Sequence, residues 1–151
     1  MMIRTAKVQD VKDIHKLIEY YADKKEMLHR SLSSIYENIQ EYVVVEKEGS
    51  IIGCGALHVS WENLAEIKAL AVAKEYTRNG VGREIVETLK RNAKNLGINQ
   101  IFTLTFKPDF FKKLKFEIVS KETLPHKIWS ECINCHLFPD CGEVPLKFFL
   151  Q

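Results

Sequence analysis

Two glycines one residue apart, Gly80 and Gly82, lie between an apolar stretch and a long run of helical periodicity. The first turn of a helix leaves several backbone N–H groups unpaired and carries a partial positive charge, and glycine lets an anion approach those groups closely. The segment therefore suits a diphosphate, although a tight loop entering a packed helix would use the same residues. The candidate binding residues are Thr77, Arg78, Asn79, Gly80, Val81, Gly82 and Arg83, of which the two arginines could add charge-assisted hydrogen bonds.

The same segment departs from two familiar nucleotide-binding motifs. Ile85 stands where a third glycine would complete the G-x-G-x-x-G pattern of dinucleotide-binding proteins. No Gly-Lys-Ser or Gly-Lys-Thr sequence follows the glycines, as a Walker A loop would require. The glycine pair therefore argues against nicotinamide cofactors and nucleoside triphosphates.

A carboxylate and an ammonium alternate within the apolar stretch Leu64–Val72, which reads as a central strand. A charged side chain there should be paired or functional. Glu66 could accept a proton from an amine, directly or through water, and Lys68 could contact an anionic substrate. A structural Glu66–Lys68 pair is the alternative. Strict alternation predicts that both side chains share one side of the strand with Leu70 and Val72.

Two further cations could recognise a carboxylate. Arg30 lies in the loop between the first two predicted helices, and its planar fork suits bidentate pairing. Lys127 lies shortly after Pro125, in a tail that could cover the site. For both residues the alternative is an ordinary solvated surface charge.

Three of the four cysteines form a cluster, Cys132-x2-Cys135-x5-Cys141, and the fourth, Cys54, lies in an apolar run typical of a core strand. The C-x2-C spacing is compatible with a structural zinc whose fourth ligand would come from His126, Asp140 or Glu143. A disulfide and free thiols are the competing interpretations, so a metal site stays open.

The elements that must position these residues follow from periodicity and turn signals. Helices are expected after Asp10, after a cap offered by Ser31, Ser33 or Ser34, over Val81–Leu96 and over Pro108–Leu114. Ser34 with Glu37 also fits a capping box. The expected strands are Ile3–Lys7, Tyr42–Glu46, Ile51–Trp61, Leu64–Val72, Ile101–Thr105, Phe116–Ser120 and Val144–Leu150. The second to fourth of these form an antiparallel meander, and the strand after the long helix should lie parallel to the one before it.

Length and composition limit the function classes. A chain of 151 residues is expected to form a single domain, 1–151. Its net charge of +2 gives no reason to expect nucleic-acid binding. No apolar run approaches the roughly 20 residues that cross a bilayer, so no membrane association is expected. The low cysteine content and the absence of an apolar signal-peptide core predict a cytoplasmic protein with reduced thiols.

The stretch from Leu70 to Gly82 and the long helix after it resemble motif A of the GNAT acetyltransferases. The order of the elements is similar to that family, and Phe110–Phe116 resembles a late F-Y-x-x-x-G-F element. The resemblance implies an α/β GNAT fold: a mixed central sheet with an antiparallel meander, splayed parallel strands and flanking helices. It implies a core over residues 1–120 and a cysteine-containing tail over 121–151.

The resemblance also implies acetyl-CoA as the donor. The pyrophosphate would lie on the amides from Arg78 to Arg83, and the pantetheine arm would pair with Leu70, Ala71 and Val72. The backbone amide near Leu70 would polarise the thioester carbonyl. Thr77 stands where the family usually has Gln or Arg. Phe111 stands where many members have a Tyr general acid, so either another group protonates the thiolate or no acid is required.

A narrower resemblance points to amino-acid N-acetyltransferases of the N-acetylglutamate synthase type. It implies acetylation of the α-amine of L-glutamate in arginine biosynthesis and, by analogy, a homodimer. The substrate-binding residues would be Arg30, Ser31, Lys68 and Lys127, with Glu66 as the base. The alternatives are another amine, such as a protein N-terminus or a small amine, and a non-catalytic CoA-binding or interaction module. The segments that carry the resemblance are Leu28–Leu32, Ile52–Leu57, Ala65–Leu70, Leu104–Thr105 and Leu124–Lys127.

Overall fold

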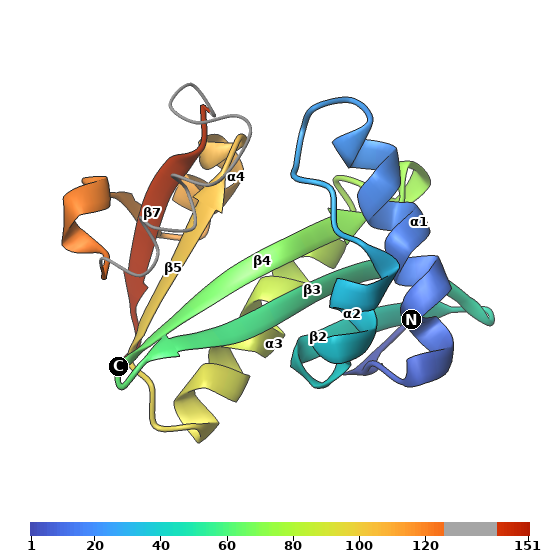
Figure 1. Ribbon diagram of the computed structural model, residues 1–151, viewed down its shortest axis with the longest axis horizontal. Helices are drawn as coiled ribbons and strands as arrows, with labels where there is room; N and C mark the ends of the chain where they lie inside the picture. The colour runs from blue at the N-terminus through green and yellow to red at the C-terminus, as the bar shows by residue number, and fades with distance from the viewer. Residues whose placement is uncertain (126–141) are drawn as a thin grey trace.

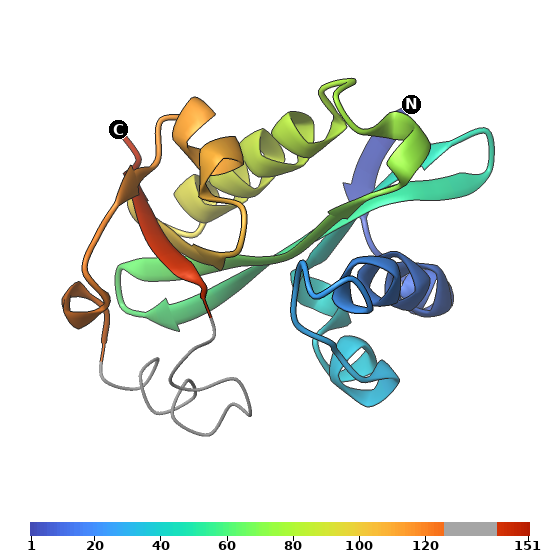
Figure 2. The ribbon, with the colours of Figure 1, turned by 90° about the horizontal axis from the view of Figure 1, so that it is seen from above.

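The computed structural model describes residues 1–125 and 142–151 (Figure 1). Seven strands form one sheet, and helices cover both of its faces (Figure 2). The strands are β1 Met2–Thr5, β2 Tyr42–Lys47, β3 Ser50–Trp61, β4 Leu64–Val72, β5 Gln100–Thr105, β6 Glu117–Ile118 and β7 Val144–Phe149. The helices are α1 Val11–Ala22, α2 Leu32–Glu37, α3 Val81–Asn95 and α4 Pro108–Lys113, with short 3-10 turns at Val8–Asp10, Ile39–Glu41, Lys74–Tyr76 and Lys121–Thr123.

The sheet order is β1-β2-β3-β4-β5-β7-β6. The β2-β3-β4 meander is antiparallel and β5 runs parallel to β4, so the predicted mixed α/β fold with flanking helices is confirmed. β7 pairs with β5 over its whole length and also with β6. Part of the segment that sequence analysis assigned to a tail therefore lies inside the sheet.

Two apolar clusters hold the helices on the sheet. On one face, Ile85 and Leu89 of α3 pack with Val45 of β2 and Ile67 of β4. The other face carries α1 and α2, whose contact residues are Val11, Ile14, Ile18 and Ile35. Both helices that contribute most to these clusters have the periodicity that predicted them.

β4 and β5 pair for only two residues before they diverge. The parallel register joins Ala65 to Ile101 and Glu66 to Phe102, and Figure 1 shows the two strands opening from there. Just beyond the last pair, the buried Thr103 hydroxyl donates a hydrogen bond of 2.8 Å to the backbone carbonyl of Ile67. The expected splay of parallel strands is thus present, and Thr103 lies at its apex.

A β-bulge interrupts β4 where the splay begins. Cys54 pairs with Ala71 and Ala56 pairs with Lys68, so β4 has one more residue than β3 across this step. Ala69 takes up the extra residue with a φ of +57°, in the left-handed region that alanine rarely adopts.

The bulge reverses the alternation of side chains along β4. Ile67 and Leu70 both pack on the α3 side, whereas Ala69 packs on the α1 side. The expectation that Glu66 and Lys68 share a face with Leu70 and Val72 is therefore wrong. The period-2 rule holds only while each strand contributes the same number of residues.

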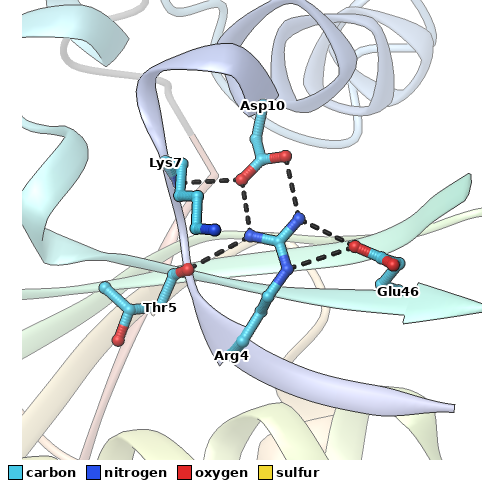
Figure 3. A network of polar contacts seen from close by, with 5 residues as sticks. All are labelled: Arg4, Thr5, Lys7, Asp10 and Glu46. Atoms are coloured by element: carbon cyan, nitrogen blue, oxygen red, sulfur yellow. Dashed lines mark hydrogen bonds and ion pairs between the residues drawn. The ribbon is translucent and has the colours of Figure 1, made fainter. Parts of the chain in front are cut away.

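The second helix begins at one of its expected caps, whereas the first does not. Ser31, one of the three candidate serines, caps α2 by accepting a hydrogen bond from the Ser34 N–H at 3.0 Å, so the Ser34–Glu37 capping box is wrong. The Asp10 carboxylate does not cap α1. It accepts a bidentate pair of hydrogen bonds from Arg4, at 2.7 and 3.0 Å, and another from the Lys7 N–H (Figure 3). Arg4 also donates to Glu46, which ties β1, β2 and the start of α1 together.

Candidate functional site

A cleft of about 590 Å³ follows the opening between β4 and β5. Its walls come from α1 and the α1–α2 loop on one side, and from β5, α4 and the N-terminus of α3 on the other. The volume falls in the range of small-molecule and cofactor sites. Of the site residues expected from the sequence, those lining the cleft are Arg30, Glu66, Lys68, Leu70, Val72, Thr77, Arg78, Gly80, Gly82 and Arg83.

One end of the cleft is the start of α3. Gly80 precedes the helix with a φ of +80°, and a Cβ at this position would meet no atom within 4 Å. Gly82 lies two residues further, against the ring of Phe110, where a Cβ would come within 3.1 Å of a ring carbon. Both glycines line the cleft, so the unpaired N–H groups and the partial positive charge at the start of this 15-residue helix lie beside it.

Three residues of the predicted phosphate and pantetheine set do not line the cleft. Val81, the first residue of α3, is buried in the core. Asn79 is exposed but does not line the cleft. Ala71 packs on the α1 side of the sheet, so only its backbone could take part. Leu70 and Val72 do line the cleft, on the far side of the bulge from Glu66.

The other end of the cleft holds the charged residues of the predicted acceptor site. Glu66 and Lys68 reach it from β4. Arg30 reaches it from the loop before α2, and its Nε atom is buried without a hydrogen-bond partner among the residues that the structure describes. Leaving a buried donor unpaired is costly, so this guanidinium is poised for an anionic ligand. Ser31 caps α2 instead of lining the cleft, and Lys127 lies outside the described residues.

Glu143 is a residue of the cleft that the sequence did not predict there. This half-buried carboxyl lies just before β7 and lines the acceptor end. Burial, reinforced by the negative charge of Glu66 and opposed by Arg30 and Lys121, raises the pKa of Glu143 to about 7. The sequence shows only an acid beside an expected strand, so the pairing of β7 with β5 was needed to find it.

Two contacts across the cleft were also missed. The Tyr21 hydroxyl on α1 donates a hydrogen bond to the backbone carbonyl of Val72, and burial raises the pKa of this phenol. Lys107, after β5, forms an ion pair of 3.1 Å with Glu26 of the α1–α2 loop. All four residues line the cleft; the first contact joins α1 to β4, and the second joins the two walls. Neither pairing has a signal in the sequence, because each joins segments distant along the chain.

Phe111 belongs to the hydrophobic core as well as to the cleft wall. It is 4% exposed, and its ring packs edge-on against Phe110 and Phe116, with centroids 5.1 and 5.2 Å apart. It supplies packing and no proton at the position where many relatives of the predicted family have a tyrosine.

The cysteine cluster cannot be placed, because Cys132, Cys135 and Cys141 lie outside the described residues. The zinc interpretation of that segment stays a prediction. Cys54 is buried in β3, its Sγ 3.4 Å from the carbonyl oxygen of Ala69, and burial raises the pKa of its thiol to about 12. It is therefore the inert core residue that the sequence predicted.

Comparison with known proteins identifies the class that this fold and cleft define. Residues 8–116 match the model of the acetyltransferase (GNAT) family, so the chain belongs to that family and is an acyltransferase. It is 36% identical over 144 residues to an uncharacterized N-acetyltransferase of Chlorobaculum tepidum, covering 95% of this chain and 93% of that one. It is 35% identical over 133 residues to an amino-acid acetyltransferase of Mycobacterium tuberculosis, covering 86% and 76%.

Solved structures agree with this relationship. A Mycobacterium tuberculosis protein in complex with CoA and NLQ superposes with a TM-score of 0.88 at 30% identity over the whole of both chains. The N-acetylglutamate synthase of Neisseria gonorrhoeae, complexed with coenzyme A and N-acetyl-glutamate, superposes with a TM-score of 0.93 at 26% identity. The match covers 99% of this chain and 35% of that enzyme.

The similarity thus extends to N-acetyltransferases of amino acids, and the structural neighbours bind CoA. Within the described part of the chain, no helix has the length and apolarity needed to traverse a membrane.

Proposed function

We propose that this protein transfers the acetyl group of acetyl-CoA to the α-amine of an amino acid, with L-glutamate as the acceptor. One observation carries the proposal: Arg30, whose buried Nε has no hydrogen-bond partner among the described residues, lines the same cleft as Glu66 and the glycine-rich start of α3. A carboxylate receptor, a proton acceptor and a diphosphate site are what this reaction requires. On this proposal the reaction is the cytoplasmic entry step of arginine biosynthesis.

The donor would occupy the α3 end of the cleft. We assign the CoA pyrophosphate to the amides between Arg78 and Arg83, where the helix dipole favours negative charge. The pantetheine arm would follow the backbone of β4 from Val72 to Leu70, in the gap where β4 and β5 no longer pair. Arg78 and Arg83 line this end and add positive charge.

The acceptor would occupy the other end. Arg30 would hold the α-carboxylate through two parallel hydrogen bonds, and Lys68 would face the side-chain carboxylate. The α-ammonium would then lie near Glu66 on the same strand as Lys68. The resemblance also implies that Ser31 and Lys127 bind the substrate; Ser31 caps α2, and Lys127 lies outside the described residues.

The reaction would be a direct transfer. Glu66 accepts a proton from the ammonium, and the free amine attacks the thioester carbonyl, forming the C–N bond. The carbonyl oxygen takes up negative charge next to the Leu70 amide, in the bulge where Ala69 and Leu70 oppose the single residue Gly55. The C–S bond breaks, and the departing CoA thiolate takes up the proton that the attacking nitrogen releases, so the step requires no dedicated acid at Phe111.

The deciding experiment measures thiol release from acetyl-CoA with each of the twenty amino acids and with amines that lack a carboxylate. L-Glutamate should support turnover, and Arg30→Ala should raise the KM for the amino acid far more than the KM for acetyl-CoA. Turnover with carboxylate-free amines alone, or equal changes in both KM values, would contradict the proposed acceptor. Arg78→Ala, at the opposite end of the cleft, is the matched control and should show the reverse split.

Glu143 favours a second acceptor, L-glutamine. Glu143 and Glu66 place two carboxyl groups at the acceptor end of the cleft. Among the described lining residues, the cations at this end are Arg30 and Lys68. A carboxamide could donate a hydrogen bond to Glu143, whereas a second carboxylate would be repelled when Glu143 is ionised. Competition between the two amino acids in one reaction, with product amounts measured by mass spectrometry, separates the candidates.

A further inference from the structure

Three potential metal ligands converge beside the C-terminal end of α1, and none of them lines the acetyl-transfer cleft. Glu19 and Asp23 are four residues apart, which places them on one face of the helix. His29 returns from the α1–α2 loop to the same face. The ligand atoms of Glu19, Asp23 and His29 all lie within 4.8 Å of one another.

We propose that Glu19, Asp23 and His29 form a binding site for a divalent metal ion of the zinc class, with water completing the coordination. Imidazole nitrogens and carboxylate oxygens are ligands that Zn²⁺ accepts in tetrahedral sites. With metal–ligand distances of about 2.0–2.1 Å, two ligand atoms of a tetrahedron lie about 3.3 Å apart.

The observed separations are close to that value. His29 Nδ1 lies 3.0 Å from Glu19 Oε2, and its Nε2 lies 3.9 Å from Asp23 Oδ1. Only small rotations of these side chains would therefore bring three ligands around one ion, with His29 coordinating through a single nitrogen and water in the fourth position.

The ligands of the proposed site differ in how exposed their side chains are. The Glu19 side chain is 31% exposed and contacts His15 and His29, so it is the fixed centre of the group. The Asp23 side chain is 71% exposed, so it can move toward an ion. Because these side chains are partly exposed, an ion can reach the site from solvent.

The electrostatic surroundings favour a cation. Asp23 is the residue at which α1 ends, and the C-terminal end of a helix carries a partial negative charge. Two carboxylates add to this charge. Lys24, the neighbouring cation in the sequence, is held elsewhere: its Nζ donates to the Tyr20 hydroxyl at 2.7 Å and lies 4.2 Å from the centroid of that ring.

The site would fix the loop that forms the acceptor wall of the cleft. His29 directly precedes Arg30, and Glu26, Met27 and Leu28 of the same loop also line the cleft. An ion that ties His29 to α1 would restrict this whole segment. Binding of the ion does not rest on the proposed function. Only the expected effect of the ion on acceptor binding rests on it.

The test uses the full chain with Cys132, Cys135 and Cys141 changed to Ser, so that thiols cannot bind the added metal. Calorimetric titration with Zn²⁺ should give one ion per chain, and Co²⁺ should give weak d–d absorption typical of nitrogen and oxygen ligands. His29→Ala and Glu19→Gln should each weaken binding by more than about tenfold.

His58→Ala is the matched control. His58 also contacts a carboxylate, Glu41 at 2.7 Å, but it belongs to no group of three ligands within residues 1–125 and 142–151. It should bind Zn²⁺ like the parent chain. The proposal is overturned if the parent binds no Zn²⁺, or if His29→Ala binds it as tightly as His58→Ala does.

Hydrogen exchange of the loop amides gives a readout that does not involve catalysis. Zn²⁺ should slow exchange over residues 24–31 in the parent and in His58→Ala, and leave it unchanged in His29→Ala. Unchanged exchange in a parent that binds the ion would overturn the loop-fixing role. If acetyl transfer fails with every amine while Zn²⁺ binding persists, the proposed function is wrong and the metal site stands.

Discussion

The Thr103 hydroxyl donates a hydrogen bond of 2.8 Å to the Ile67 carbonyl, directly beyond the last paired residues of β4 and β5. This contact replaces the backbone pairing that the two strands lose as they diverge. It satisfies a carbonyl that would otherwise be buried without a donor. Because Thr103 also lines the cleft, one side chain defines where the sheet ends and the cleft begins.

Replacing Thr103 with Val should therefore change both stability and the cleft. Valine has a similar shape but no donor, so the Ile67 carbonyl loses its partner at a cost of about 1–3 kcal/mol in the free energy of unfolding. The KM for acetyl-CoA should rise, since the apex of the splay is no longer fixed. Urea unfolding and steady-state kinetics measure the two effects. Thr103→Ser keeps the hydroxyl and should retain the wild-type KM; an equal rise in both variants would assign the effect to lost packing.

Gly80 and Gly97 provide a matched pair for testing the start of α3. Both have positive φ angles, +80° and +86°, and a Cβ at either position would meet nothing within 4 Å. Alanine should thus cost each variant a similar backbone strain of about 1 kcal/mol.

Only Gly80 lines the cleft, so only Gly80→Ala should raise the KM for acetyl-CoA. The binding of CoA itself, measured by calorimetry, should weaken in parallel. If Gly97→Ala weakens CoA binding equally, the loss comes from destabilised α3 and the phosphate site lies elsewhere.

Much of the secondary structure was predictable because it follows from local sequence patterns. The bounds of β4 and the amphipathic pattern of α3 follow from periodicity, and the glycine pair marks the helix start. The bulge at Ala69 was not predictable, since alanine gives no sign of a positive φ. Strict alternation therefore predicted that Leu70 shares a face of β4 with Glu66, whereas Leu70 packs on the α3 side.

At the acceptor end of the cleft, the sequence also could not predict which distant residues come together. Glu143 reaches the cleft because β7 inserts between β5 and β6 instead of following β6 at the edge of the sheet. Nothing in the residues around Val144 determines that order. Arg30 was predictable as a candidate from its chemistry, but its buried, unpartnered Nε depends on the packing of a loop.

Glu143 should make the choice of acceptor depend on pH. Its pKa, raised to about 7, means that the carboxyl is neutral below that pH and negative above it. The side chain of L-glutamate is ionised throughout, so repulsion should raise its KM as the pH passes 7, whereas L-glutamine carries no such charge. The ratio of kcat/KM for the two acceptors, measured between about pH 6 and pH 8, isolates this effect because their α-amines titrate alike.

Glu143→Gln should remove the pH dependence of that ratio and improve L-glutamate relative to L-glutamine at the higher pH. A ratio that still changes with pH in this variant would assign the dependence to another group. Glu117→Gln, an exposed acid on β6 outside the cleft lining, is the control and should retain the wild-type profile.

Asp10 should make the stability of the fold depend on pH in the acid range. The hydrogen bonds from Arg4 hold the pKa of this buried carboxyl below its usual value, despite the opposing effect of burial. Its contribution is therefore complete above the unfolded-state pKa of about 3.9 and is lost as the pH falls through the lower pKa of the folded state. Asp10→Asn should reduce the free energy of unfolding at neutral pH by about 1.5–3 kcal/mol, the value of hydrogen bonds to a charged group.

The difference between wild type and Asp10→Asn should shrink as the pH falls below about 3.9, because the wild-type carboxyl then takes up its proton. Urea unfolding across that range measures it. Asp13→Asn is the control: this acid is exposed in the first turn of α1, and its replacement should change stability by less than about 0.5 kcal/mol. A difference that stays constant with pH would mean that Asp10 acts through packing and neutral hydrogen bonds. The Arg4 guanidinium would then not be what stabilises its charge.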